Sequence, residues 1–214
     1  MTARTRSGSI GSVVTALVAI VLIACEAERP PAAPPSSQET SPTVSTPATP
    51  SFRFAVARRE VVRTARGGLS KRDRRIAQDA ARSVRTLITD LYAGAFLAPD
   101  AWRTGDYDDV FAIFAGEARQ EAQRRTGTLT AGEDAAQRFD SIEPAGGRLK
   151  LEILLDRSGK PAIVATDVAF RARGSGAEPT LLRSDGSYLF RRIDGGWRIV
   201  SFDVARADRE AGTT

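Results

Sequence analysis

The residue with the clearest chemistry in this sequence is Cys25, the one cysteine of the chain. A thiolate is a nucleophile that can take up a diacylglyceryl group, and the small Ala24 before it lets a peptidase approach the peptide bond. Upstream, Arg4 and Arg6 precede an uncharged apolar run at 13–25, VVTALVAIVLIAC. A basic start, an apolar middle and a small residue before the cleavage site form the layout of a secretory signal. The sequence therefore predicts export, with residues 1–24 removed as a signal peptide.

The motif Leu22-Ile23-Ala24-Cys25 also resembles the lipobox of bacterial lipoproteins. This resemblance implies that Cys25 is acylated, becomes the mature N-terminus and carries two or more chains such as palmitate, since a single chain anchors a protein only marginally. An uncleaved membrane-spanning helix is the alternative. Such a helix needs about 20 apolar residues, whereas 10–24 is shorter and is interrupted by polar or small residues. We therefore expect a lipid-anchored protein on the extracytoplasmic face of the cell membrane.

A stalk is expected between this anchor and the folded part. Residues 25–51 are rich in Pro, Ser and Thr, and 28–51 contain no aromatic or large aliphatic side chain except Val44. Such a segment cannot bury enough apolar surface to offset its ordering entropy. We predict a disordered spacer at 25–51, which reaches about 3.1 Å per residue where it is polyproline II, and a disordered tail at 209–214.

Positive charge is concentrated just after the stalk. Between Ser51 and Arg85 there are eleven Lys and Arg against three Asp and Glu, a local balance of +8 in a chain whose net charge is +5. Residues 52–68 are predicted to be a basic arm. Anionic lipid headgroups would attract such a surface by about 1 kcal/mol per cation; a solvated face is the alternative. Because the signal directs export, no nucleic-acid partner is expected. The basic surface comprises Arg58, Arg59, Arg63, Arg66, Arg72, Arg74 and Arg75.

Three helices are predicted after this arm. The first is expected at about 71–96, because Ser70 and Asp73 have the spacing of a capping box and apolar residues recur at helical spacing after them. The second is expected at about 106–125, and the third at 131–139, where Thr130 and Glu133 repeat the capping-box spacing. The loop at 98–105 between the first two holds Trp102, which we expect to plug the core.

The remainder alternates between apolar and polar residues, as strands do. Strands are predicted at 148–155, 162–173, 181–193 and 197–204, and Asp194-Gly195-Gly196 is a strong hairpin signal between the last two. Helices followed by a meander of strands are typical of an α+β fold. We expect N-terminal helices packed on a curved four-stranded antiparallel sheet, in a domain at 69–208.

This order of elements resembles the nuclear transport factor 2-like superfamily, also called SnoaL-like. The last hairpin of that family often reads Asp-Gly-Gly-Trp followed by alternating apolar residues, here Asp194 to Trp197 with Ile199 and Val200. The resemblance implies a cone-shaped sheet closed by helices around an internal pocket. A lipobox, a stalk and such a domain together also resemble small exported proteins of actinobacteria.

Catalytic members of that superfamily use either a histidine–aspartate pair or an aspartate base with a tyrosine donor. The first arrangement is excluded because the chain has no histidine. For the second, an aspartate such as Asp106 in an apolar pocket could act as a base, although capping and core packing explain the same residues. The candidate pocket residues are Tyr92, Trp102, Tyr107, Asp167 and Tyr188. No position can be assigned as catalytic, and no cofactor or metal is expected.

Three functions remain open at this point. The first is a membrane-anchored exported lipoprotein whose domain is a non-enzymatic binding or interaction module of the cell envelope. The second is a small isomerase or lyase that uses an Asp/Tyr pair in the cone pocket. The third is a structural subunit of an envelope complex. The expected partners are the membrane through Cys25, anionic lipid headgroups or an envelope protein, and a small apolar ligand.

Overall fold

The computed structural model describes residues 51–64 and 68–210 of the chain. The predicted signal peptide, Cys25 and the stalk to residue 50 lie outside the described residues, as do Arg66 and 211–214. Every statement below concerns the described ranges.

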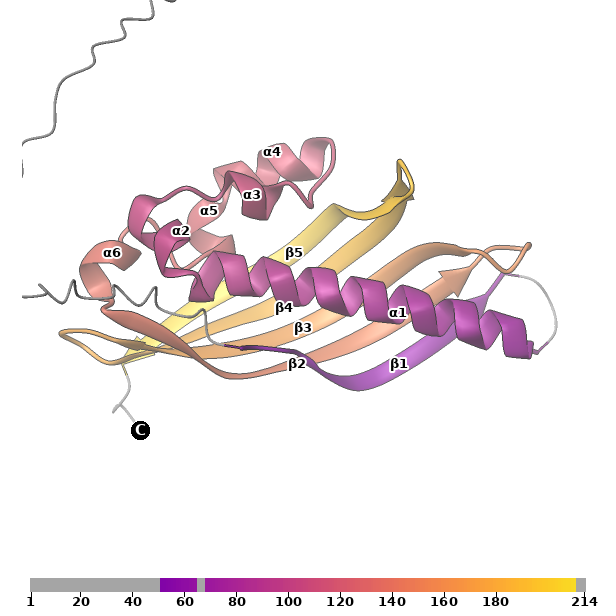
Figure 1. The fold of residues 1–214 in the computed structure, drawn as a ribbon, viewed down its shortest axis with the longest axis horizontal. Coiled ribbons are helices and arrows are strands. Elements are labelled where there is room, and N and C mark those ends of the chain that lie inside the picture. The colour runs from indigo at the N-terminus through magenta and orange to yellow at the C-terminus, as the bar shows by residue number, and fades with distance from the viewer. Residues whose placement is uncertain (1–50, 65–67, 211–214) are drawn as a thin grey trace, which may run out of the picture. The chain divides into compact units, whose positions relative to one another are not determined.

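A five-stranded sheet with the order β1-β2-β3-β4-β5 is the frame of the domain (Figure 1). Its strands are β1 (Ala55–Arg63), β2 (Ser141–Leu155), β3 (Pro161–Ser175), β4 (Thr180–Ile193) and β5 (Gly196–Glu210). β1 is parallel to β2, and the other neighbours are antiparallel. The α+β class is confirmed, but the sheet has five strands and not the predicted four. The strands also extend beyond their predicted ends, so residues 209 and 210, predicted as tail, belong to β5.

The additional strand β1 comes from the segment predicted to be a basic arm. Arg58 pairs opposite Lys150, and Val61 opposite Ile153. Just before β1, Phe54 is fully buried and packs edge to face on Tyr92, with 5.2 Å between ring centroids. Of the basic arm predicted at 52–68 as a segment outside the 69–208 domain, residues 55–63 therefore form a strand of the sheet. An edge strand can expose charged side chains to water while its backbone is paired on one side. The many arginines of this segment therefore did not indicate a strand in the sequence.

Helix α1 (Lys71–Tyr92) lies across one face of the sheet and contacts β1, β2 and β3 (Figure 1). The predicted capping box is confirmed: the backbone N–H of Asp73 donates to Ser70 Oγ at 3.1 Å, and the backbone N–H of Ser70 donates to the Asp73 carboxylate at 3.0 Å. A π-helical segment, Ala93–Leu97, continues α1. The helix and this segment together match the predicted range 71–96.

Short helices replace the two longer ones predicted after α1. They are α2 (Pro99–Thr104), α3 (Asp108–Phe111), α4 (Glu117–Arg124), α5 (Thr126–Leu129) and α6 (Ala135–Arg138). Helix α2 forms where a loop was predicted. The predicted helix at 106–125 is divided, because residues 113–115 bond instead to the edge of β5 around Ile199. Gly116 with φ of 54° then turns the chain into α4. Thr130 is not the N-cap of the predicted third helix: it ends α5, and its hydroxyl donates to the Thr126 carbonyl at 2.8 Å.

A bulge in β5 changes which of its side chains face the helices. The register shifts where Leu189 is opposite Ser201 but Phe190 is opposite Ile199, which leaves Val200 as an extra residue. Before the bulge, the odd-numbered Trp197 and Ile199 are buried. After it, the even-numbered Phe202 and Val204 face the core. Such a bulge therefore reverses the inward and outward positions along the rest of the strand.

Candidate functional site

Two of the predicted pocket residues, Tyr92 and Tyr188, meet in the interior between α1 and the sheet. The Tyr188 hydroxyl donates to the Tyr92 hydroxyl at 3.2 Å, and the Tyr92 hydroxyl bonds to Ser184 Oγ at 3.0 Å. All three side chains are buried. Burial raises the pKa of Tyr92 and raises the pKa of Tyr188 well above its ordinary value of 10.0. Both phenols therefore stay protonated, and their hydroxyls are hydrogen-bonded to each other and to Ser184.

Aromatic rings occupy the space around this tyrosine pair. Tyr92 stacks on Phe96 with 5.5 Å between centroids, and Phe170 lies 5.0 Å from Tyr92. On the other side, Phe202 and Phe114 lie 6.3 and 6.5 Å from Tyr188. These separations are those of rings in direct contact. The interior that was predicted to be a pocket is filled here by side chains.

The predicted aspartates lie away from this pair. Asp167 is exposed on the opposite face of the sheet, where its cross-strand neighbours are Lys150 and Ser187. Asp106 is also exposed, and its carboxylate accepts a hydrogen bond from the backbone N–H of Asp108 at 3.1 Å. The structure therefore brings neither aspartate to a tyrosine in the interior.

Trp102 and Tyr107 are buried under the short helices and are 2 and 4% exposed. Tyr107 packs on Phe111 at 6.3 Å, and Phe111 on Phe114 at 6.1 Å, so a row of rings links Tyr107 to the tyrosine pair. Within the described residues, Trp102 Nε1 and the Tyr107 hydroxyl have no hydrogen-bond partner. Burial raises the pKa of Tyr107. Both side chains extend the core, as predicted for Trp102.

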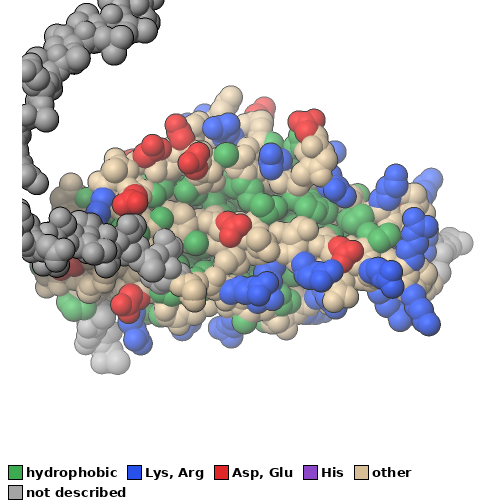
Figure 2. Space-filling view, viewed as in Figure 1, with side chains coloured by type: hydrophobic (Ala, Val, Ile, Leu, Met, Phe, Trp, Pro, Cys, Tyr) green, Lys and Arg blue, Asp and Glu red, His purple; other side chains and the backbone are tan. Residues whose placement is uncertain are grey.

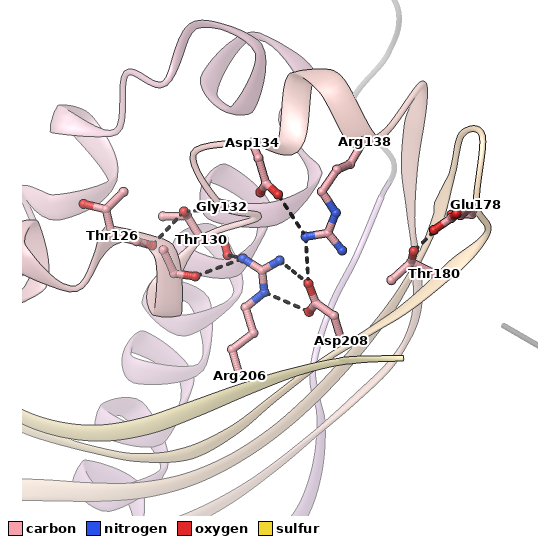
Figure 3. Close-up of polar contacts among 10 residues, drawn as sticks. Thr126, Thr130, Gly132, Asp134, Arg138, Glu178, Thr180, Arg206 and Asp208 are labelled. Atoms are coloured by element: carbon pink, nitrogen blue, oxygen red, sulfur yellow. Dashed lines mark hydrogen bonds and ion pairs between the residues drawn. The ribbon is translucent and has the colours of Figure 1, made fainter. Parts of the chain in front are cut away.

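A polar network that the sequence analysis missed joins the end of β5 to the short helices (Figure 3). Arg206 Nη1 donates to the carbonyls of Gly127 and Thr130 at 2.9 and 2.8 Å, and Arg206 Nε donates to Asp208 at 2.9 Å. Arg138 also donates to Asp208, at 3.1 Å. The Arg206 side chain is only 10% exposed. The bulge in β5 turns Arg206 inward, and no sequence pattern signalled it.

A groove, which the sequence did not predict, lies between α1 and the hairpin that joins β4 to β5. Its volume is about 870 Å³. Asp194 and Gly195 have φ of 49° and 79°, the conformation of a primed hairpin turn, which confirms the predicted hairpin. Figure 2 shows apolar side chains between α1 and this hairpin. The apolar lining includes Ile76, Ala80, Leu87, Pro161 and Trp197, and the arginines are Arg53, Arg82, Arg192 and Arg198.

The predicted basic surface is divided by the structure into free and paired arginines. Arg59, Arg72, Arg74 and Arg75 are exposed, and Figure 2 shows cations clustered over the start of α1. Arg58 pairs with Glu60 at 2.9 Å. Arg63 pairs with Asp73 at 3.3 Å and is partly buried, so it connects β1 to α1.

Over 51–64 and 68–210, no helix is both long and apolar enough to cross a membrane. Over the same part of the chain, no group of three or more His, Cys, Asp or Glu side chains is placed to hold a metal ion.

Comparison with known proteins leaves the chain without an assigned family. No family model matches it, and no curated protein matches it. Among solved structures, a protein from Novosphingobium aromaticivorans, provisionally named a scytalone dehydratase, aligns over 66% of this chain and 93% of its own, with 9% identity and a TM-score of 0.44. A SEC-C motif containing protein from Rhodopseudomonas palustris aligns over 67% of this chain and 97% of its own, with 15% identity and a TM-score of 0.32.

Proposed function

We propose that this chain is a lipoprotein of the extracytoplasmic membrane face, anchored through Cys25, whose nuclear transport factor 2-like domain is a non-enzymatic binding module. The observation that carries the proposal is the aromatic packing around Tyr92 and Tyr188. Phe96 and Phe170 pack on Tyr92 and Phe114 packs on Tyr188, so side chains take up the space beside the tyrosine pair. The domain therefore acts through its surface.

The exposed arginines support a place beside a membrane. Arg72, Arg74 and Arg75 are exposed at the start of α1, where Figure 2 shows clustered cations and few acidic side chains. An anionic leaflet attracts such a cluster by about 1 kcal/mol per cation near the surface. A lipid anchor and a basic surface together hold a protein more firmly than either alone.

The isomerase or lyase alternative lacks a supporting contact. It requires a carboxylate in the same enclosed space as a tyrosine hydroxyl. Asp167 and Asp106 are both exposed, and the hydroxyls of Tyr92 and Tyr188 are engaged with each other and with Ser184.

Metabolic labelling of the full chain in a bacterial host tests the anchor. Cells that express the wild type or Cys25→Ala receive an alkynyl palmitate, and their membranes are then washed in high salt. The wild type should carry the label and resist the wash. Cys25→Ala should carry no label and should keep residues 1–24, because the modified cysteine directs cleavage.

Ser36→Ala is the matched control, since it changes one side chain of the predicted stalk, eleven positions after Cys25, without touching the thiol. It should be labelled and cleaved as the wild type is. Labelling of Cys25→Ala, or a wild type that leaves the membrane in salt without label, would contradict the proposed anchor.

A further inference from the structure

The groove between α1 and the β4–β5 hairpin combines an apolar floor with a cationic rim. Ile76, Ala80 and Leu87 recur along one side of α1, and Trp197 faces them from β5. Trp197 is 7% exposed, and Ile76 and Leu87 are partly buried. All four side chains line the groove; Ile76 and Leu87 remain partly exposed in it, whereas Ala80 and Trp197 are nearly enclosed. The volume of about 870 Å³ lies within the range of small-molecule sites.

The rim of the groove has a net positive charge. Four arginines and one aspartate, Asp79, line it, so the balance is four minus one, or +3. Asp79 is paired with Arg82, which leaves Arg53, Arg192 and Arg198 to face other anions. A groove with this surface is complementary to an amphiphile that has one anionic group.

Arg192 lies beside the indole of Trp197, and Arg198 is bonded to the Trp197 backbone at the rim of the groove. Arg192 donates to the Gly195 carbonyl at 2.9 Å, and its guanidinium lies 5.9 Å from the Trp197 ring centroid. Arg198 donates to the Trp197 carbonyl at 3.3 Å. Each uses one donor in this way and keeps others for an acceptor, because a guanidinium has five N–H groups. The cationic end of the groove is therefore already positioned next to its apolar floor.

The backbone around the groove favours a hydrocarbon chain over an extended peptide. The peptide groups of α1 are bonded within the helix. The edge of β5 beside the groove is occupied by 113–115, where Ala115 N donates to the Ile199 carbonyl at 2.9 Å. An extended peptide in the groove would leave its own N–H and C=O groups without partners. An acyl chain has no such groups to satisfy.

We propose that this groove binds a single-chain lipid with an anionic head group. The acyl chain lies on the strip formed by Ile76, Leu87 and Trp197, and the head group is bound by Arg192 and Arg198. This inference rests on the proposed function in taking the domain to be a binding module. It goes further in naming the site and the class of ligand.

Trp197 provides the readout, because it is one of two tryptophans and lines the groove, whereas Trp102 is enclosed under the short helices. The mature wild-type protein is reconstituted in phosphatidylcholine vesicles and titrated with 9,10-dibromostearate, whose bromine atoms quench an indole on contact. Saturable quenching is expected for the wild type. The neutral brominated alcohol of the same length should quench less.

Arg192→Glu/Arg198→Glu should weaken the apparent affinity for dibromostearate by about tenfold, as expected for the reversal of two exposed charges. Arg119→Glu/Arg171→Glu is the matched control, because it makes the same charge change at exposed positions away from the groove. It should titrate as the wild type does. Trp197→Phe should lose the quenching, and if that variant does not fold, the charge variants still decide the question.

Equal quenching by the acid and the alcohol, or equal loss in both double variants, would overturn the proposal. Binding of an acidic helical peptide in place of the lipid would overturn it too. Flotation of the same vesicles reports the anchor separately. A protein that floats without saturable quenching would refute the groove site and leave the proposed function standing.

Discussion

Arg198 and Arg206 lie on the same strand, but their surroundings are opposite. The Arg206 side chain is 10% exposed and donates to Asp208 and to the carbonyls of Gly127 and Thr130. Arg198 is exposed at the rim of the groove and makes a single long hydrogen bond, of 3.3 Å, to the carbonyl of Trp197. The first arginine is part of the fold, and the second is available to a ligand.

The bulge at Val200 produces this difference. Without it, both even-numbered arginines would face outward, because side chains alternate along a strand. The extra residue turns Arg206 and Asp208 toward the short helices, where two backbone carbonyls need donors. Exposure and the number of partners, and not residue type, therefore distinguish the arginine that is part of the fold from the one that is available to a ligand.

The largest effect on stability is expected at Arg206, in the polar network at the end of β5. Arg206→Ala should lower the free energy of unfolding by about 2 kcal/mol. This is less than the loss of about 3–5 kcal/mol for a fully buried pair, since Asp208 remains 22% exposed. Urea unfolding followed by circular dichroism measures it. Arg206→Lys keeps the charge but not the forked N–H donors, so its stability should lie between those of the wild type and Arg206→Ala. A loss below about 0.5 kcal/mol for Arg206→Ala would show that Arg206 stabilises the fold no more than Arg198 does.

An intermediate effect is expected where β1 meets α1. Ser70→Ala removes the hydroxyl that accepts from Asp73 N, and should lower the free energy of unfolding by about 1 kcal/mol. The pKa of Asp73 is held below 3.8, first by the hydrogen bond from the Ser70 backbone and then by that with its hydroxyl, with Arg63 assisting.

A lowered pKa fixes the direction of the pH dependence. The stabilisation by the Asp73 carboxylate is present above the unfolded value of 3.8 and is lost as the pH falls below it through the folded value. Stability measured between pH 6 and pH 2 should therefore fall less steeply in Asp73→Asn than in the wild type. An identical slope in both proteins would show that the carboxylate contributes nothing at this junction.

The smallest effect on stability is expected at the groove. Arg198→Ala should change the free energy of unfolding by less than about 0.5 kcal/mol, as is usual for exposed side chains, while it weakens the binding of dibromostearate. Thermal unfolding beside the quenching titration tests both parts. A destabilisation as large as that of Arg206→Ala would mean that both arginines stabilise the fold to the same extent.

The local elements could be predicted because their signals are local. Ser70 and Asp73 mark the start of α1, and Asp194-Gly195 marks the last hairpin. β1 could not be predicted, because its pairing with β2 depends on residues about ninety positions away. The break at Gly116 had the same cause: the apolar spacing of a helix continues through Phe114, while the edge of β5 competes for its backbone.

The candidate site was foreseen in part. Of the candidate pocket residues, Tyr92 and Tyr188 are in contact in the interior, whereas Asp167 is exposed on the outer face. Strand alternation could have placed it, since Thr166 faces inward next to it. Arg206 and the groove depend on the bulge and on the packing of α1 against a hairpin more than a hundred residues later. No pattern within a single segment contains that information.

The parallel pairing of β1 also has a consequence for the order of folding. β2 to β5 are joined by short turns, whereas β1 must wait for a partner that follows after α1 and all the short helices. Closing so long a segment is entropically slow compared with closing a hairpin. We expect the antiparallel meander to assemble first and β1 to join last, although it is made first. Until β1 joins the sheet, the outer edge of β2 keeps unpaired backbone N–H and C=O groups that another strand could pair with.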